Sequence, residues 1–176
     1  MTADMVRTID PMIPALRRYA RALLRDRAAA DDLVQDCLER AIGRWHQRRA
    51  DGDTRAWIFT ILHNLAMTRL RRSASQPPHV TLDDAGEGNL SLGASQEDRL
   101  RYRDLLVALD QLPEEQRTVL LLVTVEELSY AAAARVLDVP IGTVMSRLSR
   151  ARERLLKLMS AESRFESAHA HVRRVK

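Results

Sequence analysis

Apolar residues recur along residues 1–72 at the spacing of helices that each bury one face. Asp31 and Asp32 are expected to supply the N-cap and an acidic first turn for the second of three such helices. The third is expected to start after Asp53 and Thr54. The positions predicted to face one shared core are Ile13, Leu16, Tyr19, Ala20 and Leu23, then Leu33, Val34, Cys37, Leu38, Ala41, Ile42 and Trp45, then Trp57, Ile58, Ile61, Leu62, Leu65, Ala66 and Leu70.

A second helical block begins at Arg99, where a stripe of leucines runs to Leu112 and stops at Pro113. Proline followed by two glutamates is typical of a new helix start. The next segment, 119–123, is almost entirely apolar, which fits a buried helix better than a strand.

The residues from Ser129 to Met159 predict a helix-turn-helix. Ser129 is expected to cap a short helix, 138–140 to turn the chain, and Gly142 and Thr143 to open a longer helix, with Thr143 as its cap. On a helical wheel, one face holds Val144, Leu148, Ala151 and Leu155, which suits a core. The outward positions are Met145, Ser146, Ser149, Arg150 and Glu153, with Arg147, Arg152 and Arg154 at the flanks.

Small polar and arginine side chains on such a face suit base edges and phosphates in the major groove of DNA. The alternative is the solvated face of an ordinary bundle helix. Five cations against one anion between Arg147 and Lys157 favour the DNA-binding interpretation.

Between the two blocks, residues 73–98 contain adjacent prolines, glycines and serines without apolar periodicity, so we expect a linker. Residues 161–176 lose the pattern and are expected to form a frayed, disordered tail. The predicted organisation is therefore all-α, with a helical bundle over 1–72 and a helix-turn-helix domain over 99–160, joined by a flexible tether.

Composition supports this division. Hydrophobic residues make up 45% of the 176 residues but aromatic residues only 4%, which favours helices over sheets. The formal net charge of +4 hides opposite charges along the chain, because residues 1–72 carry +5, residues 73–98 carry −5 and residues 99–176 carry +4. Of 28 cations 26 are arginines, which reflects either phosphate recognition or a general arginine bias.

Several function classes lack support in the sequence. Cys37 is the single cysteine, so no internal disulfide or thiolate zinc site is expected. The five histidines form no helical metal-ligand pair, and no glycine-rich phosphate loop is present, so we expect neither a metal or other cofactor nor an enzyme. No segment has the length and apolarity of a membrane span or signal peptide, so a soluble, cytoplasmic protein without membrane insertion is expected.

Two long motifs resemble those of bacterial RNA polymerase sigma factors of the extracytoplasmic-function (ECF) group. Leu112–Arg117, with Leu128-Ser129-Tyr130, Val139-Pro140, Gly142-Thr143-Val144 and Arg150-Ala151-Arg152, resembles region 4 of that family. Ala30–Asp36 resembles region 2.2, and the segments Arg55–Phe59 and His63–Arg72 resemble regions 2.3 and 2.4. The general layout also resembles the stress-response branch that a partner switch controls.

The resemblance implies a non-catalytic protein that binds core RNA polymerase and promoter DNA. The second predicted helix has an acidic face formed by Asp31, Asp32, Gln35, Asp36 and Glu39. This face is either merely solvated or docked on the clamp helices of the largest polymerase subunit. Region 4 would also contact the polymerase flap. The residues expected to recognise and melt the minus-ten element are Trp57, Asn64, Arg69, Arg71 and Arg72, although Trp57 also fits the core pattern. Asn64 matches the family asparagine at the pocket for a flipped base.

For the minus-thirty-five element, the residues implied are Thr143, Met145, Ser146, Arg147, Ser149 and Arg150. Two departures from the family pattern, Ala132-Ala133 and Met145, prevent the promoter sequence from being copied from relatives. The linker either follows the path of nascent RNA or is a solvated tether. An anti-sigma factor is implied as regulator, and a sigma-like decoy that binds an anti-sigma factor without DNA remains the rival interpretation.

Overall fold

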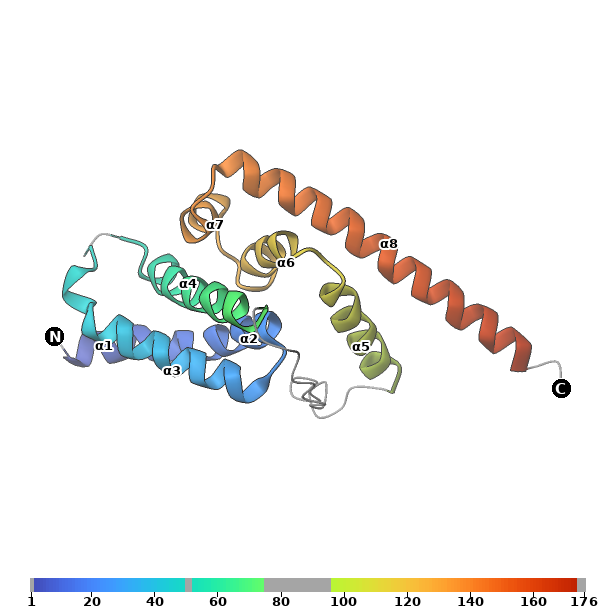
Figure 1. Ribbon diagram of the computed structural model, residues 1–176, viewed down its shortest axis with the longest axis horizontal. Coiled ribbons are helices and arrows are strands. Elements are labelled where there is room, and N and C mark those ends of the chain that lie inside the picture. The colour runs from blue at the N-terminus through green and yellow to red at the C-terminus, as the bar shows by residue number, and fades with distance from the viewer. Residues whose placement is uncertain (1, 50–51, 75–95, 174–176) are drawn as a thin grey trace. The chain divides into compact units, whose positions relative to one another are not determined.

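The computed structural model describes residues 2–49, 52–74 and 96–173, and its regular elements are helical (Figure 1). The α-helices are α1 (Thr2–Ile9), α2 (Ile13–Leu24), α3 (Arg27–Gly43), α4 (Thr54–Ala74), α5 (Gln96–Asp110), α6 (Glu114–Leu120), α7 (Tyr130–Leu137) and α8 (Ile141–Arg173). Short turns of 3-10 helix lie at η1 (Asp10–Met12) and η2 (Trp45–Gln47), and a π-helical turn, η3 (Leu121–Val125), continues α6. The all-α prediction is confirmed, and the apolar segment 119–123 is helical.

The chain divides into two compact units that cut across the predicted domains. The first combines the residues up to 83 with 121–144, and the second combines residues 84–120 with 145–176. The segment from η3 to the start of α8 therefore belongs with α2, α3 and α4, although the sequence placed it in the second domain. Most of the predicted linker, residues 73–98, lies outside the described residues, but α4 extends into it as far as Ala74 and α5 begins within it at Gln96.

The core of the first unit lies between α2, α3 and α4, which lie side by side (Figure 1). Its central side chains are almost completely buried: Leu16, Tyr19 and Leu23 from α2, Leu33 and Cys37 from α3, and Ile58, Phe59 and Leu62 from α4. The rings of Tyr19 and Phe59 meet edge to face, with centroids 5.5 Å apart. Burial also raises the pKa of the Cys37 thiol to about 12, so this cysteine is an unreactive core residue.

The observed helix ends correct three expectations, which concern the N-cap of α3, its acidic first turn and the N-cap of α8. Helix α3 begins at Arg27, and its N-cap is Asp26, whose Oδ1 accepts a hydrogen bond from the Ala29 amide at 2.9 Å. Asp31 and Asp32 lie in the second turn. Helix α8 begins at Ile141 after Pro140, whose carbonyl accepts from the amides of residues 143 and 144, so Thr143 lies within the first turn and is not the cap.

The second unit draws its core from α5, α6 and α8, with Ala108, Leu112, Val119, Leu148 and Ala151 buried. Helix α8 continues to Arg173, which corrects the prediction of a disordered tail from residue 161. The segment 160–173 lacks Gly and Pro and is rich in Ala, Glu and Arg, so its backbone favours a helix even without a periodic apolar face. Within the described ranges, no helix is both long and apolar enough to cross a membrane.

The half-buried imidazole of His63 in α4 predicts a pH-dependent stability. Burial lowers its pKa from 6.5 to about 4, and the Tyr19 hydroxyl lies 3.2 Å from its Nδ1. Because the folded-state pKa lies below that of the unfolded chain, the unfolded chain takes up the proton first as pH falls. The stability from neutral His63 is therefore complete above about pH 6.5 and is lost progressively towards pH 4. In urea unfolding at a series of pH values, the free energy of unfolding should decline less steeply towards low pH for His63→Gln than for the unchanged protein. Parallel pH profiles of the two proteins would contradict this account.

Candidate nucleic-acid interface

The first turns of α8 present a polar surface. Met145 is 53% exposed, and Ser146, Ser149 and Arg150 are exposed as well, while Val144 and Leu148 are buried beneath them. The helical wheel is thus correct for these positions. Before α8, Asp138 ends α7 in a left-handed conformation (φ 52°), which an aspartate adopts more readily than most side chains. This turn lets the chain enter α8 directly from the short helix α7.

Arg147 has a role that the sequence did not indicate. Its guanidinium lies 2.8 Å from Oε2 of Glu115 in α6, and its side chain is only 24% exposed. Both residues belong to the second unit, so the ion pair fastens α8 to α6. Arg147 is therefore occupied within the protein, whereas Arg150, one turn further along, faces solvent.

The predicted minus-ten residues separate into two groups. Asn64, Arg71 and Arg72 are exposed on α4. Arg69 instead points back to α3, where it donates to the Ala29 carbonyl at 2.8 Å and forms an ion pair with Asp36 at 2.7 Å. Arg69, which was expected among the minus-ten residues, thus joins α3 to α4.

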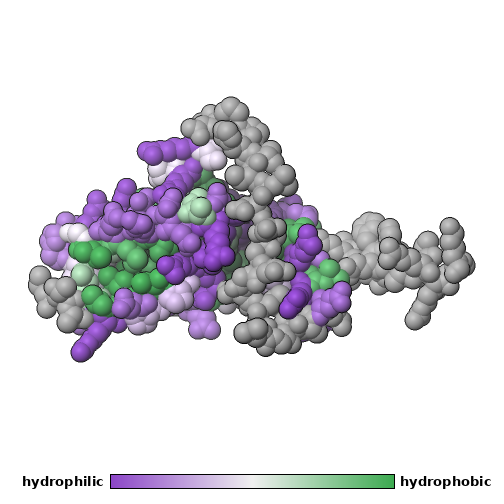
Figure 2. Space-filling view, turned by 90° about the horizontal axis from the view of Figure 1, so that it is seen from below, coloured by the Kyte–Doolittle hydropathy of each residue, from purple (hydrophilic) through white to green (hydrophobic). Residues whose placement is uncertain are grey.

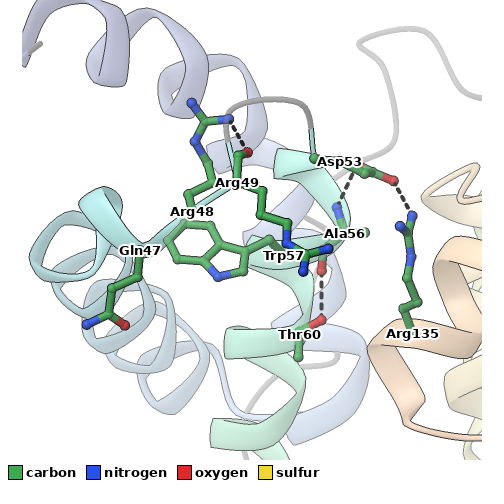
Figure 3. A pocket seen from close by; sticks show the side chains of 9 residues that line it. Gln47, Arg48, Arg49, Asp53, Ala56, Trp57, Thr60 and Arg135 are labelled. Carbon is green, nitrogen blue, oxygen red and sulfur yellow. Dashed lines mark hydrogen bonds and ion pairs between the residues drawn. The ribbon is translucent and has the colours of Figure 1, made fainter.

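A pocket of about 260 Å³ lies where the loop after η2 meets the first turns of α4 (Figure 3). The residues that line it are Gln47, Arg48, Arg49, Gly52, Asp53, Ala56, Trp57, Thr60 and Arg135. Its volume is below the roughly 300–1,000 Å³ of typical small-molecule sites. Asn64 lies one turn beyond Thr60 on α4 and does not line the pocket.

Trp57 supplies the aromatic wall of this pocket. The side chain is half-buried, which corrects its placement among the core positions. Its ring meets that of Trp45 edge to face with centroids 6.2 Å apart, and the Arg48 guanidinium lies 4.6 Å from the Trp45 ring centroid. One indole, Trp57, and three arginines, Arg48, Arg49 and Arg135, line this cavity, which combines an aromatic surface with positive charge. The sequence indicated Trp57 but none of these arginines, because Arg48 and Arg49 lie in a loop without periodicity and Arg135 comes from the distant helix α7.

Two residues of the acidic face predicted on α3 form ion pairs within the protein. Asp31 contacts Arg21 at 3.2 Å and Arg17 at 3.8 Å, and Asp36 is held by Arg69. The residues that remain exposed are Asp32, Gln35, Glu39 and Ile42, which are spaced by three, four and three positions and so form one stripe. Ile42, predicted to be in the core, is 51% exposed at the end of this stripe. Figure 2 shows hydrophobic surface among hydrophilic residues on the part of the first unit that contains α1 and α3.

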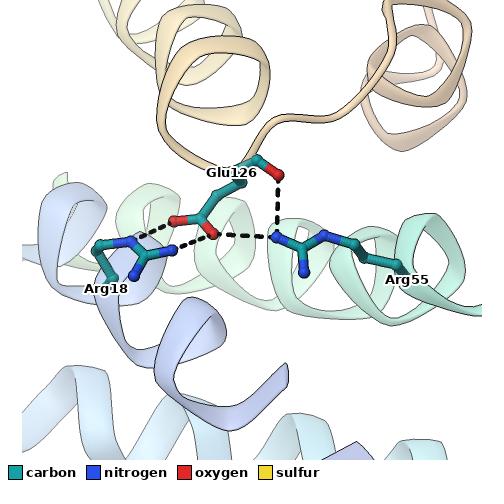
Figure 4. A network of polar contacts seen from close by, with 3 residues as sticks. All are labelled: Arg18, Arg55 and Glu126. Carbon is teal, nitrogen blue, oxygen red and sulfur yellow. Dashed lines mark hydrogen bonds and ion pairs between the residues drawn. The ribbon is translucent and has the colours of Figure 1, made fainter. Parts of the chain in front are cut away.

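The strongest polar cluster was not predicted at all (Figure 4). Glu126, between η3 and α7, has a fully buried carboxylate that accepts two hydrogen bonds from Arg18 of α2, at 2.9 and 2.8 Å. Arg55 of α4 lies 3.4 Å from the same carboxylate and donates to the Glu126 carbonyl at 2.9 Å. A glutamate directly after the apolar segment 119–125 was the only available signal in the sequence.

Comparisons with known proteins match two segments of the chain to sigma-factor family models. The family model described as the Sigma2 domain of PhyR matches residues 9–63, and the model described as Sigma-70, region 4, matches residues 102–155. The ECF RNA polymerase sigma factor EcfG of Rhodopseudomonas palustris is 34% identical, over 84% of this chain and 80% of its own length. The RNA polymerase sigma-H factor of Pseudomonas aeruginosa is also 34% identical, over 77% of this chain and 76% of its own length.

Among solved structures, the sigma factor RpoE of Bartonella quintana, in complex with the anti-sigma factor NepR, is similar with a TM-score of 0.73. The sequence identity is 32%, and the match covers 89% of this chain and 97% of that chain. CnrH, in complex with the cytosolic domain of CnrY, has a TM-score of 0.69 at 25% identity, covering 92% of this chain and 90% of that chain.

The contacts of Arg69 predict a structural effect for its removal. Arg69→Ala should lower the free energy of unfolding by about 1 kcal/mol, because it deletes a half-exposed ion pair and a hydrogen bond to the Ala29 carbonyl. The matched variant Arg72→Ala, at an exposed position of the same helix, should leave stability nearly unchanged. Urea unfolding measures both, and equal effects would show that the contact with α3 contributes nothing.

Proposed function

The chain belongs to the ECF RNA polymerase sigma factors, and from this premise we propose how its surfaces divide the work of promoter recognition. As a sigma factor it binds core RNA polymerase and directs transcription from specific promoters. We assign minus-thirty-five recognition to α8, minus-ten recognition to the pocket and exposed face of α4, and polymerase docking to α3. The observation that carries this division is that each predicted motif contributes a separate exposed polar surface.

For the minus-thirty-five element, the exposed start of α8 supplies the readout. Arg150 can bond guanine or phosphate, Ser146 and Ser149 can bond base edges, and Met145 can contact a thymine methyl group. Thr143, in the first turn, lies where backbone amides favour a phosphate. Arg147 supports this surface through Glu115 and is not itself a base contact.

For the minus-ten element, the pocket beside Trp57 is suited to a base that has left the duplex. An unstacked base loses a few kcal/mol of stacking, which an aromatic wall partly restores. Asn64 and Arg72 lie further along the same helix, where an amide can bond a base edge and a guanidinium can bond the strand that leads to the pocket. Arg71 belongs to the same exposed end of α4.

For core polymerase, the stripe formed by Asp32, Gln35, Glu39 and Ile42 is the docking surface on the clamp helices of the largest subunit. Its two carboxylates steer association with a basic partner, and exposed Ile42 gives the stripe an apolar end to bury. Asp31 and Asp36 contribute by fixing α3 against Arg21 and Arg69. Contact between region 4 and the polymerase flap completes the assembly.

An anti-sigma factor regulates the chain under this proposal. Relatives of similar length are solved as complexes with anti-sigma factors, NepR in one case and the cytosolic domain of CnrY in another. The likeness to EcfG and to the NepR-bound RpoE favours a partner of the NepR class and a general stress response. The match to the Sigma2 domain of PhyR keeps a sigma-like decoy as the second candidate, and the exposed Arg150 surface argues against it.

Promoter-directed transcription tests the whole assignment. Core polymerase with this chain should give a specific run-off transcript from genomic promoter fragments, and Arg150→Ala should reduce it roughly tenfold by weakening minus-thirty-five binding. The variant should also lower the salt dependence of DNA binding by about one counterion while leaving association with core polymerase intact. Arg99→Ala, an exposed cation on α5, is the matched control. The absence of any specific start site would refute the sigma-factor assignment, and equal loss in both variants would refute the role of Arg150.

Charge reversal on α3 tests the docking surface. Glu39→Arg should weaken binding to core polymerase roughly tenfold, because it places a cation on a surface that meets a basic partner. Asp10→Arg introduces the same change in charge at an exposed position outside α3 and should leave binding unchanged. Competition of each variant with a labelled copy of the unchanged chain for core polymerase measures the ratio of their affinities. If both reversals weaken binding equally, net charge rather than the α3 stripe controls docking.

A further inference from the structure

The start of α8 exposes two large apolar side chains. Ile141 is 49% exposed and Met145 is 53% exposed, whereas Val144 beside them is completely buried. Ile141 and Met145 are four positions apart, so they are neighbours on one face of the helix. Exposed apolar residues that occur singly are common on protein surfaces, but a neighbouring pair beside the polar residues Ser146 and Arg150 indicates a contact surface.

Gly142, the residue that follows Ile141, is not explained by the described part of the fold. Its backbone lies outside the left-handed region that favours glycine. A Cβ added to it would meet no described atom within 4 Å, apart from its chain neighbours and the backbone of its own helix. Glycine is, after proline, the residue least favourable to a helix. Since neither packing nor backbone conformation requires a glycine here, close approach of a ligand to the backbone becomes the reason for it.

The missing side chain leaves an open space on the helix surface, the Gly142 gap. Met145 and Ser146 follow Gly142 by three and four positions, so they are its nearest neighbours on that surface. Because the side chains of a helix lean towards its N-terminus, those of Met145 and Ser146 lie over the turn that contains Gly142. The gap therefore has an apolar side, formed by Met145 and extended by Ile141, and a polar side formed by Ser146.

We propose that the Gly142 gap, together with Ile141 and Met145, is the subsite at which α8 recognises the methyl group of a thymine in the minus-thirty-five element. The proposal rests on the proposed function, which places the start of α8 in the major groove. It adds Ile141 and Gly142 to the residues that determine promoter specificity.

Thymine is the base whose major-groove edge carries a methyl group. This methyl group lies on C5 beside the O4 acceptor, whereas adenine, guanine and cytosine are distinguished in the groove by polar groups. Ile141 and Met145 can bury the methyl group, and the flexible Met145 side chain can adapt to its position. The Ser146 hydroxyl, on the other side of the gap, can donate a hydrogen bond to O4.

The same geometry explains why position 142 is bare. Any side chain there would project into the space between α8 and the base edge and hold the helix away from the groove. Met145 is also one of the positions at which the chain departs from the pattern of its family. The subsite therefore distinguishes the promoters of this chain from those of its relatives.

The first experiment removes the methyl group from the DNA. The probe is a labelled duplex with the minus-thirty-five element of a promoter found in the run-off assay, in which each thymine of either strand is replaced in turn by uracil. Holoenzyme assembled from core polymerase and the full chain should bind one of these duplexes about fourfold more weakly, as expected for the loss of one buried methyl group.

Two variants separate this effect from general DNA binding. A variant that combines Ile141→Ala with Met145→Ala should bind the thymine and uracil duplexes equally. Arg150→Ala should bind both more weakly but keep the fourfold difference between them. An element without a sensitive thymine would overturn the proposal, as would a uracil effect that is the same in the double variant and the unchanged protein.

The second experiment separates the role of Gly142 in binding from any role in folding. Gly142→Ala should unfold at the same or a higher urea concentration than the unchanged protein, because the added methyl group enters open space and alanine favours a helix. Its holoenzyme should nevertheless bind the promoter duplex roughly tenfold more weakly. The matched control is Gly43→Ala at the end of α3, where an added Cβ also meets nothing within 4 Å. This control should leave promoter binding by the assembled holoenzyme unchanged.

Unchanged promoter binding by Gly142→Ala, or a lower urea midpoint, would overturn the proposed role of the glycine. A failed sigma-factor assignment would instead appear as the absence of any run-off product, and a failed minus-thirty-five assignment as full activity of Arg150→Ala. Failure of the subsite alone would appear as equal binding of the thymine and uracil duplexes while the run-off product and the Arg150 effect persist.

Discussion

The first unit depends on helix α4, which must bury one face and expose another on the same 3.6-residue period. Ile58, Phe59 and Leu62 fill the core between α2 and α3, and the adjacent positions Trp57 and Thr60 line the pocket. Because successive residues turn by about 100°, a helix of this kind has room for one core face and one outer face. Helix α7 also packs against α4, so only part of the outer face of α4 is open to solvent.

Charge pairing decides which cations are available to partners. The chain has 26 arginines, and two that the sequence assigned to nucleic acid hold helices together. Arg69 joins α4 to α3, and Arg147 joins α8 to α6. The surfaces that we propose for polymerase and promoter are consequently smaller than the segment charges suggest. They consist of the α3 stripe, the exposed end of α4 and the start of α8.

Sequence and structure agree most closely where local periodicity specifies the outcome. The core positions of α2, the cap of α7 by Ser129 and the buried face of α8 at Val144, Leu148 and Ala151 follow from spacing and capping chemistry alone. Errors occur at helix ends and at apolar residues beside them. Ile42 fits the apolar face of α3 but lies past its last core contact, and Asp26 competes with two later aspartates as the N-cap.

The sequence by itself determined the all-α class, the helix-turn-helix and the resemblance to sigma factors, because these depend on neighbours within a few turns. Only the tertiary structure decided that residues 121–144 pack with α2 and α4, that Glu126 is buried between Arg18 and Arg55, and that Arg135 lines the pocket. Arg18 and Glu126 are 108 positions apart in the chain. A contact over that separation leaves no local pattern, since burial of a charge is set by the partners that folding brings to it.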